Sequence, residues 1–498
     1  MTNRRTRRST SSPSPATRRA VAAPKAVSRK SNRTLRLSDV TVPVDTRPYF
    51  LVVDMGTFCD HRLFDTAVKR LRNRYRLAYI TTSNHKLPPS DIKLTYTIPQ
   101  GMLEYAGEIS TIMMEASFFG KVGKILKRYF RTGEALFTQI LAMMNKLTTL
   151  IRKSIRHYQP KGLLVHSGCV AQVLQANRLH VPTSVLYFAP GFLPCREIPF
   201  AFDNALTEPE TDVWNKDDKQ VRANVHSGIR YHTELQNRMH KVGEKPFDHL
   251  ARIQHLYTFD APLVPPMTYA DILPPLTVQS VGLMKPNLPT TPLDKHLAAW
   301  MRTCRRNGGT VVFVSFGSYL NNLAAYQTVK NGPTALELFL TALHQYVDGN
   351  NAHLLLHDDK QCIPAETMQH IDATLPRIRV HTSFVAYPTL VPKCAMVCFT
   401  GSVCLQNICW QHKTPMLYVP VLPEQYLWAK LYRKHTGVPF VDYQRDDLDM
   451  MAVAVKRAFA WTKTKGATTL FERVKKTIPR DAGYEVVRCI EEWGKRHV

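Results

Sequence analysis

The sequence predicts an α/β protein of two halves, each built around a parallel sheet, with a basic arm in front. Short apolar segments alternate with helical segments in both halves, which is typical of parallel sheets. A proline-rich stretch separates the two series. The first 37 residues hold eleven Lys or Arg and no acid.

Residues 1–40 predict a disordered basic arm, because a segment rich in Arg, Ser, Pro and Ala cannot bury enough apolar area to fold alone. Its cations suit a polyanion, and without aromatic residues any nucleic-acid binding would be indifferent to sequence. An organelle transit peptide, an arm like those of RNA-virus coat proteins and attraction to an anionic membrane surface are the alternatives. The candidate nucleic-acid contacts are Arg4, Arg5, Arg7, Arg8, Arg18, Arg19, Lys25, Arg29, Lys30, Arg33 and Arg36.

The first half is expected over 41–284. The stretch YFLVVDMGTFCDHRLFDTAVKRLRNRYRLAYITTS predicts strand, short loop, helix and strand. A long helical region follows over 102–158, where apolar residues recur at three- and four-residue spacing. GLLVHSG and SVLYFAP are predicted as further buried strands.

A linker is expected over 285–293 and the second half over 294–455. GGTVVFVSFGSYL, AHLLLHDDK, RIRVHTSF, AMVCFTG and PMLYVPV predict strands, with helices between them. PEQYLWAKLYRKHTG predicts a helix, with Pro at its start and Gly past its end. Helices over 456–498 follow, and packing back on the first half is one arrangement for them. Ligands of such sheets bind outside the carboxyl ends of the strands, so the cleft between the halves is the expected site.

Composition argues against a membrane protein, a secreted protein and a metal-binding protein. No run of about 18 apolar residues predicts a membrane-spanning helix, and no apolar segment near the start predicts a secretory signal. The ten cysteines show no C-x-x-C pair. Cys394, Cys398, Cys404 and Cys409 cluster without the spacing of metal ligands, so we expect buried free thiols, no metal and a reducing, cytoplasmic compartment.

Three motifs in the second half suit a phosphate- and hydroxyl-bearing ligand. Ser315, Gly317 and Ser318 form a turn after a buried strand, where backbone N–H groups and hydroxyls can hold phosphate oxygens. FTGSVCLQ places Thr400, Gly401 and Ser402 at a helix start, which is either an anion site or an ordinary N-cap. Finally, PMLYVPVLPEQ delivers Glu424 and Gln425 to a helix start, where they can bond several hydroxyls.

In this order the motifs resemble the donor half of UDP-glycosyltransferases, whose signature Pro415 to Gln425 fits at every position. The resemblance covers most of 48–498. It implies two Rossmann-like domains facing across a cleft, of the glycosyltransferase B type, with UDP-sugar as co-substrate and no other cofactor. It implies that the SFGS residues lie near the diphosphate, that Glu424 and Gln425 hold sugar hydroxyls, and that the FVAY segment flanks the uracil.

The sequence also departs from this family. Where the family has a His that contacts the diphosphate, this chain has Thr400. The family's ribose-linked acid falls on Ile408, and its asparagine falls on Cys404. Tyr387 replaces the Gln of the uracil loop and could still stack on a base. Half of the expected donor contacts are therefore changed in type.

The resemblance also places a general-base His in the loop after the first strand, at His61. A neutral His there would take the proton of the acceptor hydroxyl as it attacks the anomeric carbon. The family's partner Asp falls on His166, and a second His cannot stabilise an imidazolium as a carboxylate does. Asp54 and Asp60 are the nearby alternatives.

Two hypotheses follow. In the first, the chain transfers a sugar from a UDP-sugar to a small hydroxyl-bearing acceptor with inversion. In the second, the fold is retained without catalysis, and the chain is a structural or nucleic-acid-binding component, such as a viral coat-like protein, that acts through its arm.

Overall fold

The computed structural model describes residues 45–54, 58–82, 85–96, 145–176, 181–193, 195–199, 250–259, 276–325 and 332–497, with isolated residues between them. The basic arm and most of the predicted helical region over 102–158 lie outside these residues. The last part of that region, 145–158, is helical. Residues Arg47–Val498 form one compact unit.

The first half contains a seven-stranded parallel sheet of order β3-β2-β1-β4-β5-β6-β7. Nearly every residue of its central strands is buried, as expected where both faces of a parallel sheet are covered. Its strands are β1 (Tyr49–Val53), β2 (Arg76–Thr82), β3 (Ile92–Tyr96), β4 (Leu163–His166), β5 (Thr183–Tyr187), β6 (Gln254–Tyr257) and β7 (Thr277–Ser280).

Helix α1 (Phe58–Val68) follows β1, and α4 (Val170–Ala176) follows β4 after a short 3-10 turn. The strand order reverses between β1 and β4, because β2 pairs with one side of β1 and β4 with the other. In open α/β sheets such a reversal opens a crevice at the carboxyl ends of the two strands. The residues that follow β1 and β4 therefore lie at this reversal.

The second half contains a five-stranded parallel sheet of order β10-β9-β8-β11-β12. Its strand order reverses between β8 and β11, so Ser315 and Thr400 lie at the corresponding place. The strands are β8 (Thr310–Ser315), β9 (Ala352–His357), β10 (Ile378–His381), β11 (Met396–Phe399) and β12 (Met416–Tyr418).

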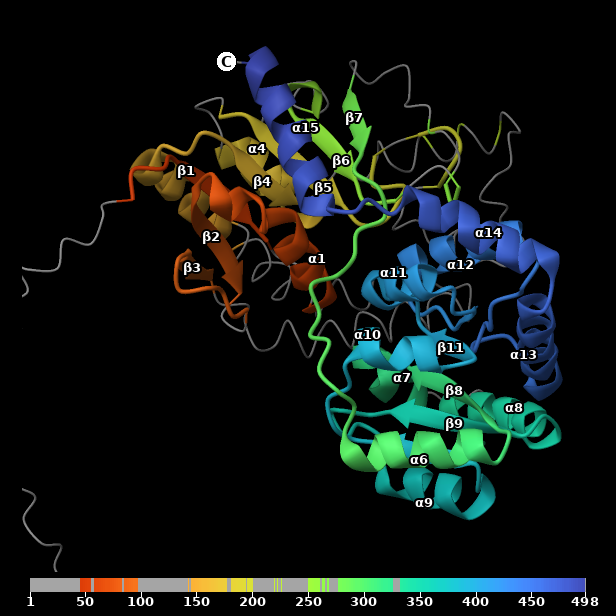
Figure 1. Ribbon diagram of the computed structural model, residues 1–498. Coiled ribbons are helices and arrows are strands. Elements are labelled where there is room, and N and C mark those ends of the chain that lie inside the picture. The colour runs from red at the N-terminus through yellow and green to blue at the C-terminus, as the bar shows by residue number, and fades with distance from the viewer. Residues whose placement is uncertain are drawn as a thin grey trace, which may run out of the picture. The chain divides into compact units, whose positions relative to one another are not determined.

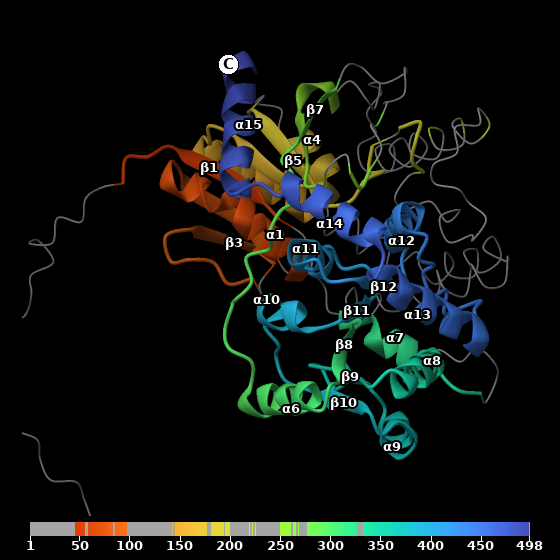
Figure 2. The ribbon, with the colours of Figure 1, turned by 45° about the vertical axis from the view of Figure 1, so that its right-hand side comes forward.

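Helices surround the second sheet: Figure 1 shows α6 and α9 below β9, and Figure 2 shows α6 to the left of β10 and α9 to its right. Helix α6 is capped by Asp294, and α8 begins with a capping box formed by Thr334 and Glu337. The helices are α6 (Lys295–Arg306), α7 (Leu320–Ala325), α8 (Ala335–Gly349), α9 (Ala365–Thr374), α10 (Tyr387–Leu390), α11 (Val403–His412), α12 (Pro423–Thr436), α13 (Leu448–Thr462) and α14 (Lys465–Thr477).

The predicted linker, 285–293, has no helix or strand and makes hydrogen bonds to both halves. The backbone N–H of Asn287 donates to the carbonyl of Arg62 on α1, and the Thr66 hydroxyl donates to the carbonyl of Lys285. At its other end, the Thr389 hydroxyl of α10 donates to the carbonyl of Thr291. Figure 1 shows this segment as the extended green coil that passes α1.

The last helix, α15 (Ala482–His497), packs on α1 and β6 of the first half. Figure 1 shows it in dark blue in front of β5 and β6. Val486, Val487 and Ile490 join the apolar cluster that includes Leu63 and Phe64 of α1. The chain therefore returns to its first half after completing the second.

A buried acidic turn connects α12 to α13 and makes the stability of this half depend on pH. Burial, together with the neighbouring Asp442 carboxylate, raises the pKa of Asp446 to about 6, while the Asp442 N–H that its Oδ2 accepts acts in the opposite direction. A carboxyl whose folded pKa exceeds its unfolded value binds its proton first in the folded state. Its effect on stability is therefore least favourable above pH 6 and improves as pH falls toward 4.

We expect Asp446→Asn to raise the unfolding temperature by about 2 °C at pH 7.5 and to leave it unchanged near pH 4.5. The asparagine oxygen can still accept the N–H of Asp442, while the half-buried charge is gone. Thermal unfolding of both proteins at the two pH values measures the difference. Asp449→Asn, an exposed change in the next helix, is the matched control and should give no gain. An equal rise in unfolding temperature at both pH values would contradict the raised pKa of Asp446.

Candidate active site

Asp54 is the first residue after β1 and is fully buried. Its backbone N–H donates to the carbonyl of Ile80, which extends the pairing of β1 with β2 by one residue. A buried carboxylate is costly unless it is hydrogen-bonded or paired. The side chains around Asp54 are therefore expected to be hydrogen-bond donors or positive charges.

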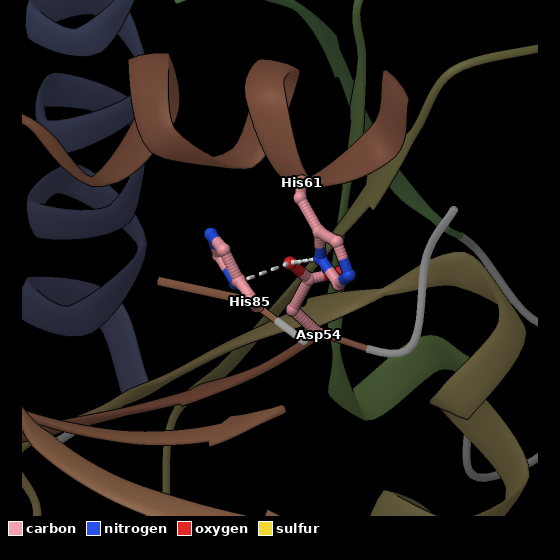
Figure 3. Close-up of side chains that lie close together, drawn as sticks. All are labelled: Asp54, His61 and His85. Carbon is pink, nitrogen blue, oxygen red and sulfur yellow. Dashed lines mark hydrogen bonds and ion pairs between the residues drawn. The ribbon is translucent and has the colours of Figure 1, made fainter. Parts of the chain in front are cut away.

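His61 lies against this carboxylate, with its Nδ1 2.5 Å from Asp54 Oδ2. Helix α1 begins at Phe58, so His61 is in its first turn. Helical side chains lean toward the N-terminus, which brings the imidazole back over the end of β1. Figure 3 shows His61 descending from the helix onto Asp54.

The pair has the geometry of a base and its orienting acid. A carboxylate only accepts, so Nδ1 of His61 donates to Asp54, and the lone pair of the neutral ring is on Nε2. A carboxylate in this position also stabilises the imidazolium that forms when the base takes a proton. His61 is 8% exposed.

His85 and Tyr79 complete the surroundings of Asp54, and neither was predicted from the sequence. The His85 ring stacks on His61 with centroids 4.2 Å apart and planes 16° apart. Its Nδ1 lies 3.9 Å from Asp54 Oδ2 and its Nε2 lies 3.5 Å from Asp65 Oδ1. The Tyr79 hydroxyl donates to Asp54 at 3.3 Å, and burial raises the pKa of this phenol well above its ordinary value, so it stays a donor.

Among the described residues, Asp54, His61 and His85 form the one group whose His, Cys, Asp or Glu ligand atoms lie close enough to hold a metal, within 4.8 Å of one another. The stacking of the rings opposes that use. An imidazole binds a metal in its own plane, and two nearly parallel planes do not meet at a shared ion. The contacts fit a hydrogen-bonded acid–base pair better than a metal centre.

His166, the partner position implied by the resemblance, lies at the end of β4 and makes other contacts. Its Nδ1 accepts the N–H of Gly168 at 3.0 Å and caps the following 3-10 turn. Its ring lies beside Phe64 and Phe188, with centroids 5.8 and 5.6 Å away. The hydrogen-bonded partner of His61 is therefore Asp54, one of the two carboxylate alternatives, and a catalytic role for His166 stays a prediction.

The turn after β8 has the backbone that the SFGS motif requires. Gly317 has a φ of +54°, and a Cβ there would meet no atom within 4 Å, so the turn is open on that side. Ser315 is nearly buried, and its hydroxyl lies 3.2 Å from the Tyr387 hydroxyl. Gly317 and Ser318 begin a 3-10 turn, and their contact with a phosphate stays a prediction.

The turn after β11 is packed tightly. Gly401 has a φ of +113°, and a Cβ there would lie 3.1 Å from Cβ of Gln425. Ser402 occupies the N-cap position of α11 without a side-chain capping bond, and Thr400 is buried. The first N–H groups of α11 have no partner within the helix, as at every helix start, and an anion site in this turn stays a prediction.

Gln425 has a structural task that the sequence did not reveal. Its Oε1 accepts the backbone N–H groups of Val421 and Leu422 at 2.8 and 3.1 Å, and the side chain is 5% exposed. The amide therefore closes the turn between β12 and α12. Glu424, half-buried in the first turn of α12, is the member of the pair with more surface for a ligand.

Positions where the family carries polar donor contacts are apolar and buried in this chain. Ile408 and Cys404 are each 1% exposed on α11, and Cys404 belongs to the apolar cluster of the first half. The predicted free thiols are found at Cys398 and Cys409, which are buried, and at Cys394, where burial raises the pKa to about 12.

The cations of the arm, from Arg4 to Arg36, lie outside the described residues, so nucleic-acid contact stays a prediction. Among the described helices, none is long and apolar enough to cross a membrane.

Searches for related sequences return nothing, because no protein-family model and no curated protein matches the chain. Solved structures do match. An anthocyanidin 3-O-glucosyltransferase in complex with UDP has a TM-score of 0.56 and 12% identity, covering 90% of this chain and 99% of that one. A UDP-glucosyltransferase from Polygonum tinctorium that glucosylates indoxyl has a TM-score of 0.55 and 12% identity, covering 90% and 98%.

The glycosyltransferase VinC in complex with dTDP matches with a TM-score of 0.54 and 13% identity, covering 90% of this chain and all of that one. Identities this low establish the fold alone. The chain therefore has the glycosyltransferase B fold of two parallel α/β sheets that the sequence predicted.

Proposed function

We propose that this chain transfers a sugar from a UDP-sugar to a hydroxyl of a small acceptor, with inversion. The hydrogen bond of 2.5 Å between His61 and the buried Asp54 is the observation that carries the proposal. It joins a base to an orienting carboxylate at the carboxyl edge of the first sheet, where ligands of this type of fold bind. The structures that match include complexes with UDP and dTDP.

In the proposed reaction, His61 Nε2 accepts the proton of the acceptor hydroxyl while the oxygen attacks the anomeric carbon, and UDP leaves from the opposite face. Asp54 holds the imidazole through Nδ1 and balances the positive charge that it gains. The open turn at Gly317 and the N-terminus of α11 would hold the diphosphate through backbone N–H groups, where the chain lacks the family's His. Glu424 would bind sugar hydroxyls. No metal takes part in this scheme.

The base and its partner are tested by substitution. We expect His61→Ala to lower kcat/KM by about 10²–10⁴-fold while UDP binding is retained, because only proton transfer is removed. Asp54→Asn should cause a comparable loss, since an amide can hold the wrong tautomer of His61. UDP release from a panel of UDP-sugars and phenolic or alcohol acceptors measures the rates, and calorimetry measures the affinity for UDP.

His157→Ala, a change on an exposed helical surface, is the control and should retain full activity. His166→Ala should cost less activity than Asp54→Asn if Asp54 is the partner of the base. A wild-type rate in His61→Ala, or no binding of millimolar UDP by the wild-type protein, would contradict the proposed sugar transfer.

Substitution of Gln425 should mainly lower stability, whereas substitution of Glu424 should mainly weaken ligand binding. Gln425→Ala leaves two backbone N–H groups without an acceptor, so we expect the free energy of unfolding to fall by about 1–3 kcal/mol. Glu424→Ala should stay within about 0.5 kcal/mol of wild type and should weaken the binding of UDP-glucose more than that of UDP. Denaturant unfolding measures the stability of both variants, and calorimetry measures their affinity for UDP-glucose and UDP. Equal effects of the two substitutions on stability and on affinity would contradict a structural role for Gln425 and a ligand-binding role for Glu424.

A second candidate is a protein of this fold that does not transfer sugar and contacts nucleic acid through its arm. Thr400 in place of the family's His, and the buried Ile408 and Cys404, favour it. The absence of UDP release in wild type, with nucleic-acid binding retained, would select this candidate over the first.

If the arm binds nucleic acid, removing residues 1–37 should abolish RNA retention in a filter-binding assay. Retention of RNA by the full chain should fall steeply between 50 and 200 mM salt, because each phosphate contact releases counterions. Binding that survives without the arm, or that ignores salt, would count against nucleic-acid binding through this segment.

A further inference from the structure

The ring of His85 covers one face of the His61 ring. The two imidazoles stack with centroids 4.2 Å apart and planes 16° apart. Figure 3 shows the rings beside each other, with Asp54 in contact with both. The stacking acts on the face of the His61 ring, whereas the bond from its Nδ1 to Asp54 lies at the ring edge. The two contacts therefore restrict different movements of the same imidazole.

His85 is itself held by three elements of the first half. From β2, the Thr81 hydroxyl lies 3.2 Å from its Nδ1. From α1, Oδ1 of Asp65 lies 3.5 Å from its Nε2, and from β3 the ammonium of Lys93 donates to its backbone carbonyl. The ring of Tyr79 meets it edge-on, with centroids 5.4 Å apart. The place of the His85 ring is therefore set by contacts that do not involve His61.

The two nitrogens of His85 face the protein, which argues against its use as a second base. Its Nε2 is fully buried and faces Asp65, a carboxylate that also lies 3.7 Å from Nη2 of Arg72. Its Nδ1 faces Thr81 and, at 3.9 Å, Asp54. A general base has to come within hydrogen-bond reach of the proton that it takes. His85 can therefore act on the reaction only through His61.

Stacking controls a movement of His61 that hydrogen bonds leave open. The N–H bond and the lone pair of an imidazole lie in the ring plane, so bonds at one nitrogen or at both still allow the ring to turn about the line through them. A second ring packed against the face opposes this turn, because a close-packed interior leaves no space for it.

We propose that His85 is a positioning residue, whose flat ring fixes the tilt of the His61 imidazole and so directs Nε2 toward the acceptor hydroxyl. The assignment rests on the proposed function, since a direction for Nε2 matters only if His61 takes a proton. Proton transfer tolerates little misplacement of the reacting atoms, so loss of the stacked ring should slow the chemical step and leave ligand binding intact.

Two apolar substitutions isolate the flat ring. His85→Phe and His85→Leu both remove the contacts with Thr81 and Asp65, but only phenylalanine can stack. We expect His85→Leu to lower kcat by about tenfold or more and His85→Phe to retain most of the wild-type kcat. KM for the acceptor and the affinity for UDP should be the same in all three proteins. His157→Ala is again the control with full activity. Equal kcat in the Phe and Leu variants would overturn the proposal.

The stacking has a readout that needs no substrate and no folded variant at position 85. In NMR of the full wild-type chain with ¹³C-labelled histidine, the ring resonances that disappear in His61→Ala belong to His61. We expect a nuclear Overhauser effect between these ring protons and those of one other histidine, and its absence would overturn the stacked arrangement and the proposal with it.

The two measurements also separate this inference from the proposed function. If wild type releases no UDP, the proposed function fails, and the positioning role fails with it even where the rings are seen to stack. If wild type is active and kcat does not distinguish His85→Phe from His85→Leu, the proposed function stands and the positioning role alone fails.

Discussion

The buried carboxylate of Asp54 is the constraint around which the first half is organised. A charge without contact to water has to be matched by donors, and these come from His61 of α1 and Tyr79 of β2. The His85 ring, from the segment after β2, stacks on His61. Their arrangement needs β1 and β2 in register and α1 close to the strand end. The same contacts that stabilise the carboxylate also orient the imidazole, so stability and the proposed reactivity depend on one set of residues.

In the second half, the turns after β11 and β12 contact each other. Gly401 lacks a side chain where Gln425 needs room, and Gln425 in turn holds the N–H groups of Val421 and Leu422. The turn after β11 and the turn after β12 are thus shaped together. A ligand held by backbone N–H groups in these turns would meet a surface that is already fixed, which lowers the entropy cost of binding it.

Much of the fold could be predicted from the sequence, because buried parallel strands leave continuous apolar runs and helix boundaries leave Pro, Gly and capping residues. The candidate site was only partly predictable. His61 follows from its place after β1, but its partner depends on how far the imidazole swings back over the strand end, which spacing does not determine. Asp54 carried a signal, since a carboxylate directly after a buried strand lies at the edge where sites form. Nothing in the local sequence distinguished Gln425 as a turn-closing amide from Gln425 as a ligand contact, and His85 reaches the site only through the path of the chain after β2.

The return of α15 to the first half has a consequence for synthesis on the ribosome. The apolar surface formed by Leu63 and Phe64 of α1 is completed by Val486, Val487 and Ile490. During translation that surface emerges early and stays uncovered until the whole second half has been made. The nascent first half therefore keeps an exposed apolar surface over that interval, which favours aggregation of the incomplete chain.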